Sequence, residues 1–215
     1  MYDSLIDKGL IGTDEAGKGD YFGPLVCAAC YVDSELLQSL TNIGIRDSKK
    51  ISNNRIIEIA AAIKNVCPHI IIAIGPEKYN ELYAKMKNLN KLLAWAHAKA
   101  IENLLEKVAC TNVLIDKFGN ETLMINALHK VSQKINLLQE HKAESNIAVA
   151  AASILARAEF LYRLKSLSKK YDVALHPGAG APTDKSILKF ANLHGENKLS
   201  FAAKVHFKNT QKVLG

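Results

Sequence analysis

Four carboxylates stand next to apolar segments, and these are the residues whose type and placement could do chemistry. Asp14 and Glu15 follow the apolar start of LIGTDEA (residues 10–16), and Asp116 ends the apolar run NVLID. Glu144 lies just before a run of small apolar residues, where its charge would also favour the N-terminus of a helix. A carboxylate at the end of a buried strand is costly unless it is paired or binds a cation.

If these four acids meet in space, divalent metal ions would relieve their mutual repulsion. Ligands that are all oxygen suit hard ions, so Mg²⁺ or Mn²⁺ is expected. Two such ions about 3.5–4 Å apart can activate water and stabilise the leaving oxygen in phosphodiester cleavage. The spacing does not show that the acids converge, and each alone also fits an ion pair or a helix cap. For Glu144 alone that simpler interpretation is favoured.

A glycine turn follows the first two acids. Gly17-Lys18-Gly19 offers backbone N–H groups beside one cation, which suits a sugar-phosphate backbone. A dinucleotide-binding motif also places G-x-G after a strand, but here the next glycine, Gly23, comes one residue late. Pro24 and an apolar strand then follow, where that motif needs a helix. The sequence therefore favours a turn that contacts sugar or phosphate over a dinucleotide site.

The segments that must position these residues alternate between short apolar runs and helical patterns. Strands are expected at residues 10–16, 24–32, 69–75 and 112–116. Helices are expected at 35–40, 53–66 (after the N-cap Ser52), from 76 onward, 89–108, 145–171, 183–193, and in the tail 200–214. This order predicts an α/β fold with a mixed central sheet flanked by helices. A single domain, residues 1–215, is expected, with a C-terminal helical part from about 172.

The composition excludes several classes of protein. Of the 215 residues 48% are hydrophobic, which supports a packed core and argues against disorder. The longest apolar stretch, residues 147–156, is too short to cross a bilayer, and no export signal opens the chain. A cytoplasmic protein without membrane contact is expected. The net charge of +7 fits a polyanionic partner, but an ordinary mixed-charge surface fits it at least as well.

The four cysteines predict no metal or redox site. Cys27 and Cys30 have C-x-x-C spacing, but residues three apart on a buried strand point to opposite faces. Cys67 and Cys110 have no cysteine or histidine at ligand spacing. The favoured interpretation is four small hydrophobic side chains in a reducing cytosol.

Several of these segments together resemble a known family. GTDEAGKGDYFGPLVCAA (12–29) resembles the opening motif of the type 2 ribonucleases H, and its DYFGP part resembles ribonuclease HIII in particular. The resemblance continues in order through RDSKK (46–50), NLNKLLAWAHAKAI (88–101), VLIDKF (113–118), HKAESNIAVAAASILAR (141–157) and AAKVHFKNTQK (202–212). It covers nearly the whole chain.

The resemblance implies a ribonuclease H-like fold and a metal-dependent endoribonuclease. Such an enzyme cleaves the RNA strand of RNA/DNA hybrids with two Mg²⁺ or Mn²⁺ ions and leaves 5′-phosphate and 3′-hydroxyl ends. The metal-binding and catalytic acids of the family fall on Asp14, Glu15, Asp116 and Glu144. Glutamate in the fourth place resembles ribonuclease HIII, since the HII enzymes usually carry aspartate. The hybrid is the expected partner, with no organic cofactor and a monomeric enzyme.

The same resemblance implies which residues contact the hybrid. Gly17, Lys18 and Gly19 would contact ribose 2′-hydroxyls, which distinguish RNA from DNA. Five further residues would hold a phosphate or line the groove near the metals: Ser48, Lys49, Lys142, Ser153 and Arg157. The last two lie four residues apart and so share a helix face. Each of these residues also fits an ordinary polar position.

Two features depart from the family pattern. Ribonuclease HIII proteins usually carry an extra N-terminal substrate-binding domain, and here Asp14 is almost at the start, so that domain is expected to be absent or removed. The HII enzymes use a tyrosine between two glycines to sense an RNA–DNA junction, where this chain has Gly178-Ala179-Gly180. Efficient incision at a single ribonucleotide is therefore in doubt. An HII-like junction nuclease and a non-catalytic hybrid-binding module are the alternatives.

Overall fold

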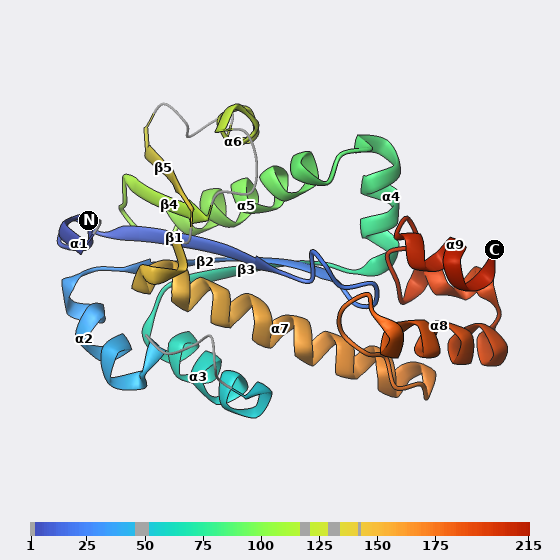
Figure 1. The fold of residues 1–215 in the computed structure, drawn as a ribbon. Helices are drawn as coiled ribbons and strands as arrows, with labels where there is room; N and C mark the ends of the chain where they lie inside the picture. The colour runs from blue at the N-terminus through green and yellow to red at the C-terminus, as the bar shows by residue number, and fades with distance from the viewer. Residues whose placement is uncertain (1–2, 46–51, 117–120, 129–133, 142) are drawn as a thin grey trace. The chain divides into compact units, whose positions relative to one another are not determined.

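Five strands form one sheet in the order β3-β2-β1-β4-β5 (Figure 1). The computed structural model describes residues 3–45, 52–116, 121–128, 134–141 and 143–215. The strands are β1 (Leu10–Ala16), β2 (Leu25–Val32), β3 (His69–Ile74), β4 (Asn112–Asp116) and β5 (Asn136–Glu140). β1 pairs in parallel with β4, and β4 with β5, within a mixed sheet. The predicted α/β architecture is confirmed.

Helices connect and flank these strands. In chain order they are α1 (Asp3–Ile6), α2 (Ser34–Ile43), α3 (Asn53–Val66), α4 (Pro76–Met86), α5 (Leu89–Leu105), α6 (Glu121–Ala127), α7 (Ile147–Tyr171), α8 (Ala181–His194) and α9 (Lys208–Leu214). The 3₁₀ segments η2 (Ala143–Ser145) and η3 (Glu196–Phe201) also lie within the described ranges. No helix in the described ranges is long and apolar enough to span a membrane.

Local signals account for several helix ends. The Asp33 carboxylate accepts a hydrogen bond of 3.0 Å from the Leu36 amide and caps α2. The Ser52 hydroxyl caps α3 in the same way, as the sequence predicts. Pro76 opens α4 at a position where a helix needs no N–H group.

The chain forms two compact units by its internal contacts. The first contains residues up to 15, 27–72 and 89–158, and the second contains 16–26, 73–88 and 159–215. In the first unit, Figure 1 shows α5 on one face of the sheet and the first half of α7 on the other. The apolar face of α5 packs there against Ile11 of β1 and Val113 and Ile115 of β4. The expectation of a single domain over residues 1–215 stays a prediction.

The structure differs from the sequence-based prediction in three places. The tail 200–214 is not one helix, because Ala203 forms an antiparallel bridge with Phe22 and the residues after it form turns before α9 begins. β5 and α6 were not predicted, since both are short and β5 is only half-buried, so neither carries a clear apolar pattern.

The structure agrees with the interpretation of the cysteines as small hydrophobic side chains. Cys27 and Cys30 are completely buried on β2, Cys67 is buried, and Cys110 is partly buried. All four are free thiols.

Candidate active site

One face of β1 points toward α5 and carries Thr13 and Glu15, which share a face because side chains alternate along a strand. The buried His97 of α5 contacts both of them. Its Nδ1 lies 3.1 Å from Thr13 Oγ1, and its Nε2 lies 3.2 Å from Glu15 Oε2. The His97 imidazole therefore bridges the Glu15 carboxylate and Thr13 of the same strand.

The other face of β1 carries Gly12 and Asp14 and lies against α7. A Cβ added at Gly12 would stand 2.2 Å from the carbonyl carbon of Ala148 and 2.3 Å from the amide nitrogen of Val149. Only glycine allows the helix backbone to come so close. The small residues that begin α7 make this approach possible. It brings Ser153, one of the predicted groove residues, within hydrogen-bond reach of the Asp14 carboxylate.

The charge of Asp14 is destabilised where it stands. Burial and the repulsion of neighbouring Glu15 raise the pKa of Asp14 to about 6. Hydrogen bonds from the Ser153 hydroxyl and from the Glu15 amide, at 2.8 Å, oppose that rise without cancelling it. A bound cation would favour the ionised carboxylate, so these two acids suit a metal site.

His97 is held in its charged form by its neighbours. Burial alone would lower the pKa of His97, but the Cys27 sulfur and the Glu15 carboxylate outweigh burial and raise that pKa to about 10. An imidazolium donates hydrogen bonds from both nitrogens, which matches its contacts with Thr13 and Glu15. Sequence reasoning missed His97. The available signal was a single histidine on the otherwise apolar face of a helix.

Asp116 reaches the same edge of the sheet as Asp14. The parallel register pairs Thr13 with Ile115, so each acid is the next residue on its strand, and the strands are neighbours. Asp116 Oδ1 also accepts a hydrogen bond of 3.1 Å from the Ala143 amide, which fastens η2 to β4. Glu144 belongs to η2, and its side chain lies outside the described part of the chain.

The backbone thus brings the segments of all four predicted acids to one unit and one sheet edge. Among the side chains that the structure describes, no three His, Cys, Asp or Glu residues lie close enough to hold a metal ion. That set does not include Glu144. Shared metal binding by the four acids therefore stays a prediction.

The glycine turn belongs to the second unit. Gly17 has φ +86°, and a Cβ there would lie 2.2 Å from the Pro24 carbonyl oxygen, so the turn requires glycine at this position. Gly19 is exposed and faces open space, and Lys18 is partly exposed. The predicted turn is confirmed, whereas its contact with ribose stays a prediction.

Of the other predicted contact residues, Ser153 and Arg157 lie within the described part of the chain. Arg157 is exposed, and its Nη2 donates to Asn53 Oδ1 at 3.1 Å, at the start of α3. Ser48, Lys49 and Lys142 lie outside the described residues.

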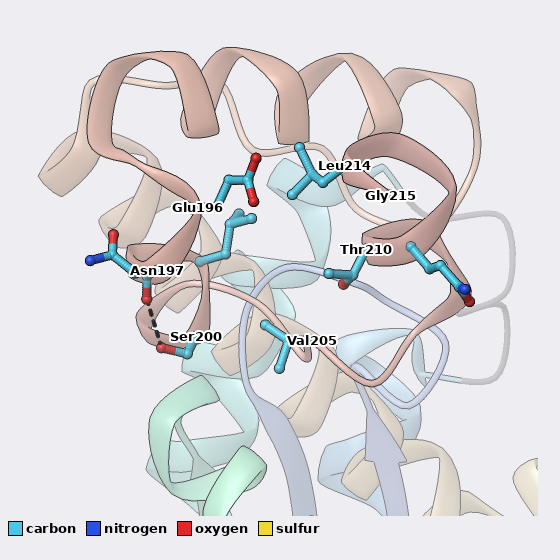
Figure 2. A pocket seen from close by; sticks show the side chains of 9 residues that line it. Glu196, Asn197, Ser200, Val205, Thr210, Leu214 and Gly215 are labelled. Carbon is cyan, nitrogen blue, oxygen red and sulfur yellow. Dashed lines mark hydrogen bonds between the residues drawn. The ribbon is translucent and has the colours of Figure 1, made fainter.

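A separate pocket of about 500 Å³ lies in the second unit near the end of the chain (Figure 2). Its lining includes Glu196, Ser200 and Thr210, and no predicted site residue takes part in it. Thr210 connects the pocket to the segment that follows the glycine turn, because Thr210 Oγ1 lies 3.0 Å from the Tyr21 hydroxyl. The pocket is not itself a candidate catalytic site.

Comparison with known proteins agrees with the fold and with the motifs. The Ribonuclease HII family model matches residues 11–210. Ribonuclease HIII of Protochlamydia amoebophila is 43% identical over 205 residues, which cover 95% of this chain and 68% of that protein. Ribonuclease HIII of Chlamydia pneumoniae is 41% identical over 206 residues, covering 94% and 69%.

A solved structure is similar over the same region. The crystal structure of Bst-RNase HIII in complex with Mn²⁺ superimposes with a TM-score of 0.90 at 34% identity, covering 98% of this chain and 70% of that one. The ribonuclease H-like fold is therefore confirmed. The chain belongs to the ribonuclease HII family of endoribonucleases.

Proposed function

We propose that this chain hydrolyses the RNA strand of RNA/DNA hybrids with the help of divalent metal ions. The observation that carries the proposal is the placement of Asp14 and Glu15 at the end of β1. There burial and the neighbouring Glu15 disfavour the charge of Asp14 and raise its pKa in the absence of a cation. Asp116 ends the neighbouring strand. The similarity to a ribonuclease HIII whose crystal structure contains Mn²⁺ supports the choice of a divalent ion.

The residues that would hold the ions are Asp14, Glu15, Asp116 and Glu144. Their carboxylate oxygens suit Mg²⁺ and Mn²⁺. When bound, two ions would lower the pKa of the attacking water and stabilise the departing 3′-oxygen, which yields 5′-phosphate and 3′-hydroxyl ends.

The chain itself orients these ligands before any ion binds. Ser153 holds Asp14 on one face of β1, and His97 holds Glu15 on the other. Groups that support a metal ligand in this way fix its orientation and its basicity. The two carboxylates therefore need little rearrangement to bind an ion.

Selection of RNA would come from the glycine turn. Gly19 is exposed with open space around it, so a sugar can approach its backbone closely. A backbone N–H in the Gly17–Gly19 turn would then contact a ribose 2′-hydroxyl, which DNA lacks. Ser48, Lys49, Lys142, Ser153 and Arg157 would hold the remaining backbone of the hybrid. We further propose that the enzyme acts as a monomer in the cytoplasm, without an organic cofactor.

The test compares Asp14→Asn with Asp7→Asn, an exposed acid on the surface of the first unit. Cleavage of a long RNA/DNA hybrid is measured with Mg²⁺ and with Mn²⁺, and hybrid affinity is measured separately. Asp14→Asn should reduce cleavage by more than about 100-fold, the upper range for groups that only support a ligand, with little change in affinity. Asp7→Asn should leave both unchanged.

A duplex with one embedded ribonucleotide, assayed beside the long hybrid, separates the alternatives. Prompt incision 5′ of the single ribonucleotide would indicate HII-like behaviour. Binding of the hybrid without cleavage in either metal would indicate a binding module. Full activity of Asp14→Asn would refute the assignment of these acids as the metal-binding site.

A further inference from the structure

The side chain of Lys204 is completely buried, which is unusual for a lysine. Its Nζ donates hydrogen bonds to the Asp20 carbonyl at 2.7 Å and to the Gly23 carbonyl at 2.8 Å. It also lies 5.6 Å from the centroid of the buried Tyr79 ring. Burial lowers the pKa of Lys204 to about 7, and the charge of Asp20 opposes that fall only in part, so the site disfavours the ammonium.

The two carbonyls that Lys204 binds lie at the two ends of the Asp20–Gly23 segment, which directly follows Gly19. The main chain of the tail pairs with the same segment. The Lys204 amide donates to the Tyr21 carbonyl at 2.8 Å, and the Gly23 amide donates to the Ala202 carbonyl at 3.0 Å. One residue thus holds this segment through both its backbone and its side chain.

A second loop holds the start of the segment. The Asp20 carboxylate accepts a hydrogen bond from the Gly178 amide, and the Tyr21 amide donates to the Gly178 carbonyl at 3.0 Å. Asn209 then binds the carbonyl of the next residue, Ala179, at 3.0 Å. The segment that follows the glycine turn is therefore fixed by contacts to the C-terminal part of the second unit.

The Lys204 ammonium supplies what an apolar side chain of similar volume cannot. It donates to two carbonyl oxygens at once and so fixes both ends of the Asp20–Gly23 segment. Without this donor both carbonyls would lose their hydrogen-bond partner, which is destabilising. The ammonium therefore contributes a defined backbone conformation as well as stability.

We propose that Lys204 is a positioning residue that fixes the Asp20–Gly23 segment and so sets how the Gly17–Gly19 turn meets the ribose of the substrate. The inference rests on the proposed function, because it assigns a support to the turn that would recognise RNA. It adds a residue far along the chain to the determinants of RNA recognition.

The experiment uses Lys204→Met, which keeps the length of the side chain and removes the donor. Lys198→Met, at an exposed lysine of η3, is the matched control. Thermal midpoints are measured first, since Lys204→Met leaves two carbonyls without their donor and should lower the midpoint, and the assays are run at a temperature where both variants are folded. Steady-state cleavage of a long hybrid should then show KM raised by about 10- to 100-fold, with a smaller change in kcat.

Affinity measurements distinguish positioning from general damage. Each protein is titrated with an RNA/DNA hybrid and with a DNA duplex of the same sequence, in Ca²⁺ in place of the catalytic metal. Lys204→Met should lose most of the preference for the hybrid while its affinity for DNA stays the same. A normal preference in a folded Lys204→Met protein would overturn the inference. A wild-type protein that neither prefers nor cleaves the hybrid would instead overturn the proposed function.

A measurement on the unmodified protein covers the case in which Lys204→Met fails to fold. Hydrogen exchange of the Tyr21 and Gly23 amides is followed with and without the hybrid. If Lys204 orders the segment in advance, both amides are protected in the free protein and change little on binding. Protection that appears only with the hybrid would contradict the inference.

Discussion

Replacing Gly12 with alanine should push α7 away from β1 and disturb the site through stability and geometry together. The new Cβ would lie 2.2 Å from Ala148 C, 2.3 Å from Val149 N and 2.6 Å from Ala148 O. An ordinary contact begins at 3.4 Å, so the helix would have to retreat by about 1.2 Å. No change of rotamer can relieve the clash, because all three atoms belong to the helix backbone.

The size of the effect follows from that displacement. Overpacking of a core costs about 1–3 kcal/mol, and a contact with rigid backbone belongs at the upper end, about 3 kcal/mol. For a chain of this length each kcal/mol lowers the melting temperature by about 2–4 °C, so a loss of about 6–12 °C is expected. The same retreat separates Ser153 from Asp14, and a misplacement of about 1 Å near reacting groups can reduce the rate by about 100-fold.

Thermal unfolding and hybrid cleavage below the transition test this prediction. Gly19→Ala serves as the control for stability, because its Cβ would meet no atom within 4 Å. Its melting temperature should stay within about 2 °C of the wild type, as for an ordinary surface substitution. A Gly12→Ala protein with an unchanged melting temperature and full activity would refute the close approach of α7 to β1 and the role assigned to it.

Three further predictions concern pH, metal affinity and helix capping. Since the pKa of Asp14 is about 6 in the fold against an ordinary 3.8, this carboxyl group is protonated to a greater extent in the folded, metal-free protein than in the unfolded chain between these values. The contribution of Asp14 to the free energy of unfolding, measured with denaturant as the difference between the wild type and Asp14→Asn, should therefore fall as pH rises from about 4 to about 6. His97→Phe should raise the Mn²⁺ concentration needed for half-maximal cleavage by about 10- to 100-fold, because Glu15 loses its support; an unchanged metal titration would argue against this role. Asp33→Ala should cost about 1 kcal/mol and lower the melting temperature by about 2–4 °C without affecting cleavage, since it removes only the N-cap of α2.

Local sequence was sufficient for much of the fold and for the first part of the site. An apolar run that ends in an acid can be recognised within a short stretch of sequence. Both β1 with Asp14 and Glu15 and β4 with Asp116 could therefore be predicted directly. The glycine turn could be predicted as well, because Gly17 needs a backbone conformation that other residues rarely adopt. β5 could not, since a short, half-buried edge strand takes its conformation from the strand beside it and shows little apolar pattern.

Tertiary structure alone decided which groups support the acids and the turn. His97 lies more than eighty positions from Glu15 and reaches it only because α5 packs on that face of β1. Lys204 lies more than 180 positions from Asp20, and its ammonium meets that carbonyl only once the tail pairs with the Asp20–Gly23 segment. Residue type and local spacing therefore determined which groups could do chemistry. Their supports depend on contacts between distant segments, which no local pattern encodes, and only the folded chain brings them together.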